Sequence, residues 1–454
     1  MQIRKSTLVI FSFLLLFWVA GSVPFVCQEI THDKCESVRL MTNNICQLGM
    51  ICLGAWLLRS RVDIAIIAIT VAVSYYSTCS LNGEGVVTWL NGLRRYAPYM
   101  FVLPVIRYLW SDPERRTRFV EAFDKTLYIF LIVQFPCLSL QALMYGMGDT
   151  GGGSLGWDYS GVISQLIYMI SFYLMVRRWN PQRSYLQNLG DNYVLLLLLL
   201  PSFLNETKIS FIFLLLYFPM LLPFDRHLLK RLLLIIPLLI IVFSGLMLWY
   251  SNNVNTRDNL MDANFMNNYV FGDDMIDLAF DLLDSDVDTD EVWEADYARG
   301  IKFALLPTLL ERGDNDNELW GYGVGQFKGG NGVEKTKFAK HYDWILRGTQ
   351  TELFDAVVEL GYIGGALLFL FWGAIFRFFK RAGKGNRNGR MQWWLGLNIL
   401  MMILYTPAFD TLPFVCISLF MVFASSRWSE LPPYKESYIF FPPKKQPECL
   451  PQSR

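Results

Sequence analysis

About twelve long apolar runs follow one another along this chain of 454 residues, separated by short charged segments. A transmembrane helix needs about 20 mostly apolar residues, because the hydrocarbon core of a bilayer is about 30 Å thick. Hydrophobic residues make up 53% of the chain, and charged residues, at 18%, fall below the roughly 25% of soluble domains. The sequence therefore predicts an all-α polytopic membrane protein with about twelve transmembrane helices. The runs cover residues 6–26, 41–58, 63–80, 91–110, 126–146, 161–177, 191–206, 208–224, 231–250, 352–376, 393–408 and 411–427.

The distribution of Lys and Arg predicts the orientation of these helices, because basic residues in short loops stay on the cytoplasmic side. With the N-terminus inside, 26 of the 40 basic residues fall on cytoplasmic segments. Most of the others lie in one long polar loop between the ninth and tenth runs, and long loops cross the membrane largely regardless of charge. We therefore expect both termini in the cytoplasm and residues 251–351 outside.

This layout divides the chain into four regions. Residues 1–250 carry the first nine helices, 251–351 form the large outer loop, 352–427 carry the last three helices, and 428–454 form a Pro-rich cytoplasmic tail that we expect to be disordered. The loop is expected to be mainly helical, with one helix over 297–310, a Gly-rich turn, and a shorter basic helix near 335–344. Its acidic stretch, 273–296, lacks the Gly and Glu that an EF-hand calcium loop requires, so it predicts a solvated face.

Cysteine and histidine usage argues against a metal centre. The eight cysteines are scattered without a CxxC pattern, and the three histidines are far apart in the sequence. Cys27 and Cys35 flank one short outer loop, where either a disulfide or two reduced thiols can occur. The chain also has no Walker, Rossmann or kinase pattern, so we expect no metal, nucleotide or other cofactor and no nucleic-acid partner.

Three short motifs lie in or beside the long loop. Arg299-Gly300 begins a predicted helix, Gly321 to Phe327 reads Gly-Tyr-Gly-Val-Gly-Gln-Phe, and Glu359 to Gly364 reads Glu-Leu-Gly-Tyr-Ile-Gly. Residues 91–98 (Asn-Gly-Leu-Arg-Arg-Tyr-Ala-Pro) and 205–208 (Asn-Glu-Thr-Lys) add two further patches. In this order and on this side of the membrane, the motifs resemble the O-antigen ligase and Wzy-type polysaccharide polymerase superfamily, whose large outer loop also lies between its ninth and tenth helices.

One departure from that superfamily distinguishes its two branches. The ligases carry a His followed by Asn, Ser or Gln, and nine further residues separate this pair from a Gly-x-x-Gly element. Counted back from Gly361, this pair falls on Gln350-Thr351, and His341 is out of register with it. Many polymerases also lack the His, so the substitution favours the polymerase branch.

The resemblance implies a donor sugar linked to a lipid diphosphate, which brings its own leaving group. Arg and Lys suit such a donor, because they bind the diphosphate and stabilise the charge that develops on it. We therefore take Arg94 and Arg299 as catalytic candidates. Each cation also has a structural alternative: snorkelling for the pair at 94–95, pairing with Glu206 for Lys208, and solvation for those in the loop. The further diphosphate- or sugar-binding candidates are Arg95, Lys208 and Arg347.

A transferase of this kind also needs a base for the acceptor hydroxyl. Glu352 is the candidate catalytic base, and Asp355, Glu359 and His341 are alternatives, of which the two acids share one helix face with Glu352. Glu359 also has a structural interpretation, as a brace for the Gly361 turn. Two aromatic candidates for stacking on sugar rings are Trp320 and Tyr322, although aromatic residues also gather at membrane interfaces.

The resemblance thus implies an integral membrane glycosyltransferase of a bacterial inner membrane. It would polymerise oligosaccharide repeat units carried on undecaprenyl diphosphate at the periplasmic face. Membrane lipids, a chain-length regulator and a flippase are its expected partners. One alternative is a ligase that moves finished polymer to a lipid A-core or protein acceptor. An alternative from another class is a secondary transporter of an anionic solute, although the paired broken helices of such transporters are not evident in the sequence.

Overall fold

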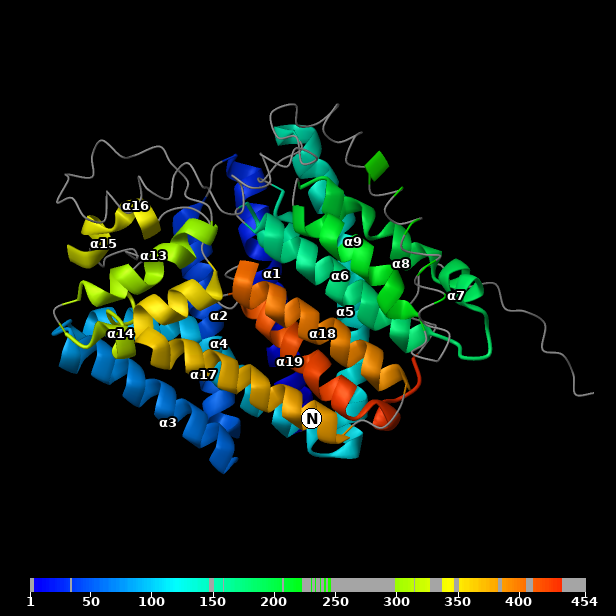
Figure 1. The fold of residues 1–454 in the computed structure, drawn as a ribbon. Helices are drawn as coiled ribbons and strands as arrows, with labels where there is room; N and C mark the ends of the chain where they lie inside the picture. Colours follow the sequence, from blue (N-terminus) through cyan, green and yellow to red (C-terminus); the bar gives the residue numbers. More distant parts are fainter. Residues whose placement is uncertain are drawn as a thin grey trace, which may run out of the picture.

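The computed structural model is helical in every element that it describes, and no strand occurs in that part of the chain (Figure 1). Six positions from 230 to 245 are described, each as part of a helix: 230, 233, 237, 241, 244 and 245. The description otherwise covers residues 4–32, 35–146, 151–157, 159–205, 208–222, 299–313, 315–326, 337–346, 351–382, 386–405 and 411–434. The ninth apolar run, the acidic stretch and the tail beyond 434 lie outside these ranges.

The helices before the long loop match most of the predicted apolar runs. They are α1 (Lys5–Thr31), α2 (Glu36–Leu57), α3 (Arg61–Tyr75) continued by the π-helix η1 (Tyr76–Leu81), α4 (Val86–Trp110), α5 (Pro113–Tyr145), the short turn η2 (Gly153–Leu155), α6 (Ser160–Arg178), α7 (Tyr185–Asp191), α8 (Tyr193–Leu197), η3 (Leu200–Phe203) and α9 (Lys208–Leu221).

The loop and the C-terminal part supply the remaining helices. They are α13 (Arg299–Glu311), α14 (Asn317–Trp320), α15 (Lys337–His341), α16 (Asp343–Leu346), α17 (Glu352–Ala382), α18 (Asn386–Tyr405), α19 (Leu412–Ser426) and the turn η5 (Trp428–Glu430). The predicted helix at 297–310 corresponds to α13. The predicted basic helix near 335–344 is divided into α15 and α16.

Six of the described helices are long and apolar enough to cross a membrane. They indicate a membrane protein, although twelve spans stay a prediction. The helices α4 and α18 are long enough but less apolar, and the runs at 191–206, 208–224 and 411–427 form shorter helices. The six are Lys5–Thr31, Ser37–Leu57, Arg61–Leu81, Pro113–Tyr145, Ser160–Arg178 and Glu352–Ala374.

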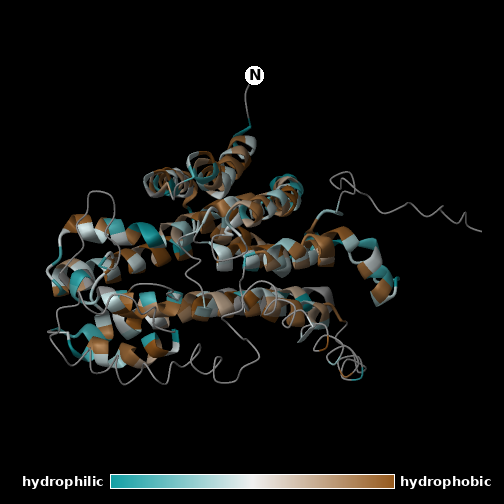
Figure 2. Cartoon of the chain, turned by 90° about the horizontal axis from the view of Figure 1, so that it is seen from above, coloured by the Kyte–Doolittle hydropathy of each residue, from teal (hydrophilic) through white to brown (hydrophobic). Residues whose placement is uncertain are grey.

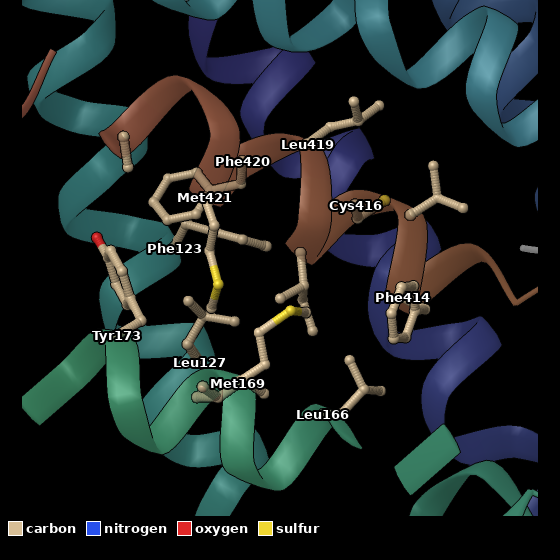
Figure 3. Packing of buried hydrophobic residues seen from close by; sticks show 14 of the residues in the cluster. Phe123, Leu127, Leu166, Met169, Tyr173, Phe414, Cys416, Leu419, Phe420 and Met421 are labelled. Carbon is tan, nitrogen blue, oxygen red and sulfur yellow. The ribbon is translucent and has the colours of Figure 1, made fainter. Parts of the chain in front are cut away.

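The main core surrounds α19, in which every side chain is buried. Helices α1, α4, α6, α17 and α18 contact it, and aromatic rings fill the space between helices. Phe420 of α19 packs edge-on against Phe123 of α5 at 4.5 Å between ring centroids, beside Met169 and Tyr173 of α6 (Figure 3). Since every side chain of α19 is buried among these neighbours, α19 is the central element of the bundle.

The outermost helices have the opposite pattern, with large apolar side chains on their exposed faces. Phe11 of α1, Leu48 of α2 and Val62 of α3 are each about 60% exposed. Hydrophobic residues dominate the long helices, as the brown segments in Figure 2 show. Soluble proteins rarely expose apolar surface over whole helices, so these faces fit contact with lipid.

A second apolar cluster lies at one end of the bundle, where the loop helices meet the beginning of α17 (Figure 1). Apolar side chains on one face of α13 enter this cluster, because they recur at helical spacing. The cluster attaches the described part of the loop to the transmembrane bundle. Its buried members are Ile301, Leu305, Leu306, Leu309, Leu310, Tyr322, Trp344, Ile345, Leu346, Phe354, Val357 and Val358.

Candidate functional site

Helices α4 and α17 bring Arg95 against two carboxylates at the edge of the second cluster. Nη2 of Arg95 lies 2.8 Å from Oε2 of Glu352 and 2.5 Å from Oδ2 of Asp355. The two acids are three residues apart, so they occupy one face of the first turn of α17. All three side chains are buried or nearly so, with 12%, 6% and 1% of their surface exposed. An Arg–carboxylate contact with so little water is much stronger than an exposed one.

A third carboxylate continues the same face of α17. The hydroxyl of Tyr96 donates to Oε2 of Glu359 at 2.6 Å, and the backbone N–H of Gly325 points to Oε1 at 3.4 Å. Glu359 is 3% exposed. Since Arg95 and Tyr96 are consecutive on α4, one turn of that helix contacts all three acids of α17. We call Arg95, Tyr96, Glu352, Asp355 and Glu359 the acid–arginine cluster.

The segment Gly321–Gly325 covers this cluster and depends on a break in α17. Gly361 has φ +65° and ψ −164°, which interrupts the helix and frees the carbonyls before it. The backbone N–H groups of Tyr322 and Gly323 donate to the carbonyls of Val358 and Glu359, both at 2.9 Å. The segment thus satisfies the acceptors that the break would otherwise leave buried and unpaired.

Glycine is required on both sides of this contact. A Cβ atom at Gly361 would overlap the Leu319 carbonyl, and a Cβ at Gly321 would overlap the backbone around Leu360. Gly321, Gly323 and Gly325 also have φ between +71° and +95°, a region that favours glycine. The Gly-Tyr-Gly-Val-Gly and Glu-Leu-Gly motifs therefore form one structural unit.

The opposite side of Gly321–Gly325 rests on η1 and α4. Oγ of Ser77 donates to the Trp320 carbonyl at 2.6 Å, and Thr78 Oγ1 accepts from the backbone N–H of Val324 at 2.9 Å. Asn82 Nδ2 donates to the Gly321 carbonyl at 3.0 Å. A Cβ at Gly92 would overlap the backbone of Gly325. The segment is therefore wedged between α17 and the α3–α4 pair, directly beside the acid–arginine cluster.

The other predicted cations fall elsewhere. Arg94 is adjacent to Arg95, but successive residues of a helix point about 100° apart, and its guanidinium donates to Oδ1 of Asn44 in α2. The guanidinium of Arg299 lies over the ring of Tyr405 in α18, 4.0 Å from its centroid. Arg347 and the side chain of Lys208 lie outside the described part of the chain.

The two predicted sugar-stacking residues pack within the protein. Trp320 contacts Tyr76 of η1 edge-on, with 4.6 Å between ring centroids. Tyr322 stacks on Phe338 at 4.0 Å, and its hydroxyl donates to the Leu309 carbonyl. Both contacts are structural, and a role in sugar binding stays a prediction for either residue.

Of the predicted site residues, the structure brings Arg95 and Glu352 together. Tyr96 was not singled out from the sequence, where its only signal was its place after the two arginines in the motif at 91–98. Asp355 and Glu359 were named only as alternative bases, and their spacing from Glu352 was the available signal. In the described ranges, no group of three or more His, Cys, Asp or Glu side chains is arranged to hold a metal ion.

Comparisons with known proteins give no assignment. No family model matches the chain, and no curated protein gives a significant match to it.

Proposed function

We propose that this protein is an integral membrane glycosyltransferase of a bacterial inner membrane, which polymerises undecaprenyl-diphosphate-linked oligosaccharide repeat units at the periplasmic face. The acid–arginine cluster is the observation that supports this proposal most. It combines a cation for a diphosphate with carboxylates that can accept a proton, at the edge of a loop segment and a transmembrane bundle. Three of the motifs that resemble the Wzy-type superfamily, at 91–98, 321–327 and 359–364, contribute to or border this cluster.

The proposed topology has twelve helices, cytoplasmic termini and a periplasmic loop. One contact supports it: Arg4, before α1, pairs with Glu114 at the start of α5. In the proposed topology both residues are cytoplasmic, so they must lie at the same end of the bundle. The outer loop helices gather around the other end of α4, next to Arg95.

The proposed reaction is a single displacement at the anomeric carbon of the growing chain. A hydroxyl of the incoming repeat unit loses its proton to Glu352 while its oxygen forms the new glycosidic bond. The bond between the anomeric carbon and the diphosphate oxygen breaks, and undecaprenyl diphosphate leaves with the electron pair. Inversion at the anomeric carbon follows from attack opposite the leaving group.

The contacts of Arg95 suggest how donor binding prepares the base. A carboxylate held by a guanidinium is a weaker base, because the ion pair stabilises its charged form. A diphosphate that binds the Arg95 guanidinium in place of Glu352 would release Glu352 from the ion pair. Asp355 would still hold the guanidinium in place. Arg95 would then stabilise the leaving group. Arg94 and Arg299 contact Asn44 and Tyr405, so for them, as for Lys208 and Arg347, a role at the diphosphate stays a prediction.

The test uses a strain that lacks the gene and complements it with variants. We expect Arg95→Ala and Glu352→Gln to abolish long surface glycans and to leave single repeat units, read as a band pattern on gels. Arg118→Ala is the matched control, because Arg118 pairs with Glu114 at the cytoplasmic end of α5. Protein in the membrane is measured by immunoblot for each variant. Wild-type chain lengths in both site variants would refute the site.

The same strain separates the ligase alternative. Loss of a polymerase leaves single-unit glycans on the acceptor, whereas loss of a ligase leaves the acceptor without any repeat unit. If surface glycan is unchanged in the deletion strain, both transferase functions are excluded and transport becomes the leading hypothesis.

A further inference from the structure

The turn between α1 and α2 brings two thiols together. Cys27 belongs to the last two turns of α1, and Cys35 immediately precedes α2. Their Sγ atoms are 2.7 Å apart, and Oγ1 of Thr31 lies 2.8 Å from Sγ of Cys35. Both cysteines are partly buried. The sulfurs are therefore within reach of each other without any movement of the two helices.

The two described residues that border this turn have backbone conformations of high energy. His32 has φ +54° and Cys35 has φ +45°, and left-handed conformations are uncommon for residues other than glycine. Such residues persist where the surrounding structure holds them in place. A covalent link between the sulfurs would supply that restraint at the Cys35 end of the turn.

We propose that Cys27 and Cys35 form a disulfide in the mature protein. The two thiols together lose two electrons and two protons, and a new S–S bond forms between them. The oxidant is the disulfide of a thiol–disulfide oxidoreductase, which is reduced to two thiols in the exchange. Disulfides persist on the oxidising side of a bacterial inner membrane, so the turn must lie on the periplasmic side.

The link would fix the end of α1 that holds a buried Gly-rich segment, residues 151–157. Oε1 of Gln28 accepts from the backbone N–H of Trp157 at 2.8 Å. Glu29 accepts from the hydroxyl of Tyr145 at 3.2 Å and from the indole N–H of Trp157 at 3.4 Å. Gln28 and Glu29 directly follow Cys27, so the disulfide holds the residues that seat this segment between α1, α5 and α6.

This inference requires the periplasmic position of the turn and does not require a transferase reaction. A failure of the polymerase assignment therefore leaves it intact. A failure of the disulfide in turn does not affect the acid–arginine cluster, which lies on other helices.

Trypsin offers a direct test, because it cuts after Lys34 and so separates the two cysteines into different peptides. Cells that express the full chain are treated with N-ethylmaleimide before lysis, and the membrane protein is digested without reductant. We expect Ser6–Lys34 to be recovered joined to Cys35–Arg39, two hydrogen masses below the sum of the two peptides. Recovery of both peptides as maleimide adducts would overturn the proposal, and so would a link from either cysteine to another chain.

A matched pair of variants gives a second readout. With Cys35→Ser, Cys27 should become accessible to a maleimide polymer in denatured, unreduced protein, which adds one step to the gel shift. With Cys52→Ser, a substitution on the exposed surface of α2, the shift should lose one step and the linked peptide should remain. A shift that loses one step with Cys35→Ser, as the removal of a free thiol would give, would overturn the proposal. If Cys35→Ser is not recovered in the membrane, the peptide measurement on wild-type protein decides alone.

Discussion

The bundle around α19 and the junction around Gly321–Gly325 are held together in different ways. In the bundle, large apolar side chains fill the space between helices, as Phe123 and Phe420 do around α19 (Figure 3), with Phe119 edge-on to Phe420. At the junction, backbones touch each other directly, and many of the surrounding side chains are charged, hydroxylated or amide-bearing. The bundle therefore depends on side-chain volume, whereas the junction depends on the absence of Cβ atoms and on charge pairing.

This difference has a functional meaning. The close-packed apolar side chains around α19 give stability but provide no reactive groups, so this core is a scaffold. The buried Asp124–Arg177 pair beside Tyr173 is a separate polar contact of the bundle. The junction contains a guanidinium and three carboxyl groups with little water, an arrangement that costs free energy unless the groups are paired. Proteins retain such groups mainly where they are needed for function. Substitutions in the two regions should therefore fail in different ways.

The largest effect is expected for Gly361→Ala. The added Cβ overlaps the Leu319 carbonyl, and φ of +65° is strained for alanine. We expect a loss of more than about 4 kcal/mol, the range reserved for severe structural damage. Little monodisperse protein should then be extracted in detergent, as size-exclusion chromatography would show. Gly373→Ala is the matched control, because a Cβ at this other glycine of α17 meets nothing within 4 Å. Equal yields of the two variants would contradict the proposed junction.

Phe420→Ala tests the bundle. Removal of a buried Phe side chain typically destabilises a protein by about 3–5 kcal/mol, through lost burial and the cavity that remains. We expect a lower melting temperature in detergent, while the glycan chain length per folded molecule stays normal. A variant as stable as wild type would contradict the packing role of Phe420. A stable but inactive variant would show that α19 is more than a scaffold.

Arg95→Ala should destabilise the protein by a similar amount but for a different reason. It leaves Glu352 and Asp355 buried without their guanidinium, and breaking a buried ion pair costs about 3–5 kcal/mol. A second substitution, Asp355→Asn, removes one of the stranded charges. It should therefore recover about 1–3 kcal/mol in a double-mutant cycle read by thermal unfolding. Strict additivity would mean that the two side chains do not interact.

The smallest effect is expected for Tyr96→Phe. This change removes the hydrogen bond to Glu359 and little volume. A hydrogen bond to a charged group contributes about 1.5–3 kcal/mol, and a small decrease in melting temperature should follow. Tyr108→Phe on the same helix is the control, because Tyr108 lies about three turns along α4 from Tyr96, with its ring beside the Arg115 guanidinium. A neutral Tyr96→Phe would show that this hydrogen bond does not contribute to stability.

The sequence predicts much of the helical architecture, because runs of about 20 apolar residues have few alternatives to a membrane helix. Arg95 and Glu352 could be named as candidates from their chemistry. The contact between them could not be predicted, because the two residues are more than 250 positions apart and no local pattern determines how α4 and α17 pack. For the same reason, the dependence of Gly361 on Gly321–Gly325 is not evident from either motif. From the sequence, Arg94 is the catalytic candidate and Arg95 a binding candidate, and only the rotation of α4 shows that Arg95 is the one that contacts the acids.

The most direct test of the account is polymerisation by purified protein in liposomes. Undecaprenyl-diphosphate-linked repeat units are supplied, and the product ladder is compared for wild type, Glu352→Gln and Arg118→Ala. General acid–base catalysis contributes about 10²- to 10⁴-fold, so Glu352→Gln should slow ladder formation at least about 100-fold, while the variant still binds the lipid-linked donor. Arg118→Ala should match wild type. A wild-type ladder from Glu352→Gln, or no ladder from wild-type protein, would contradict the proposed function.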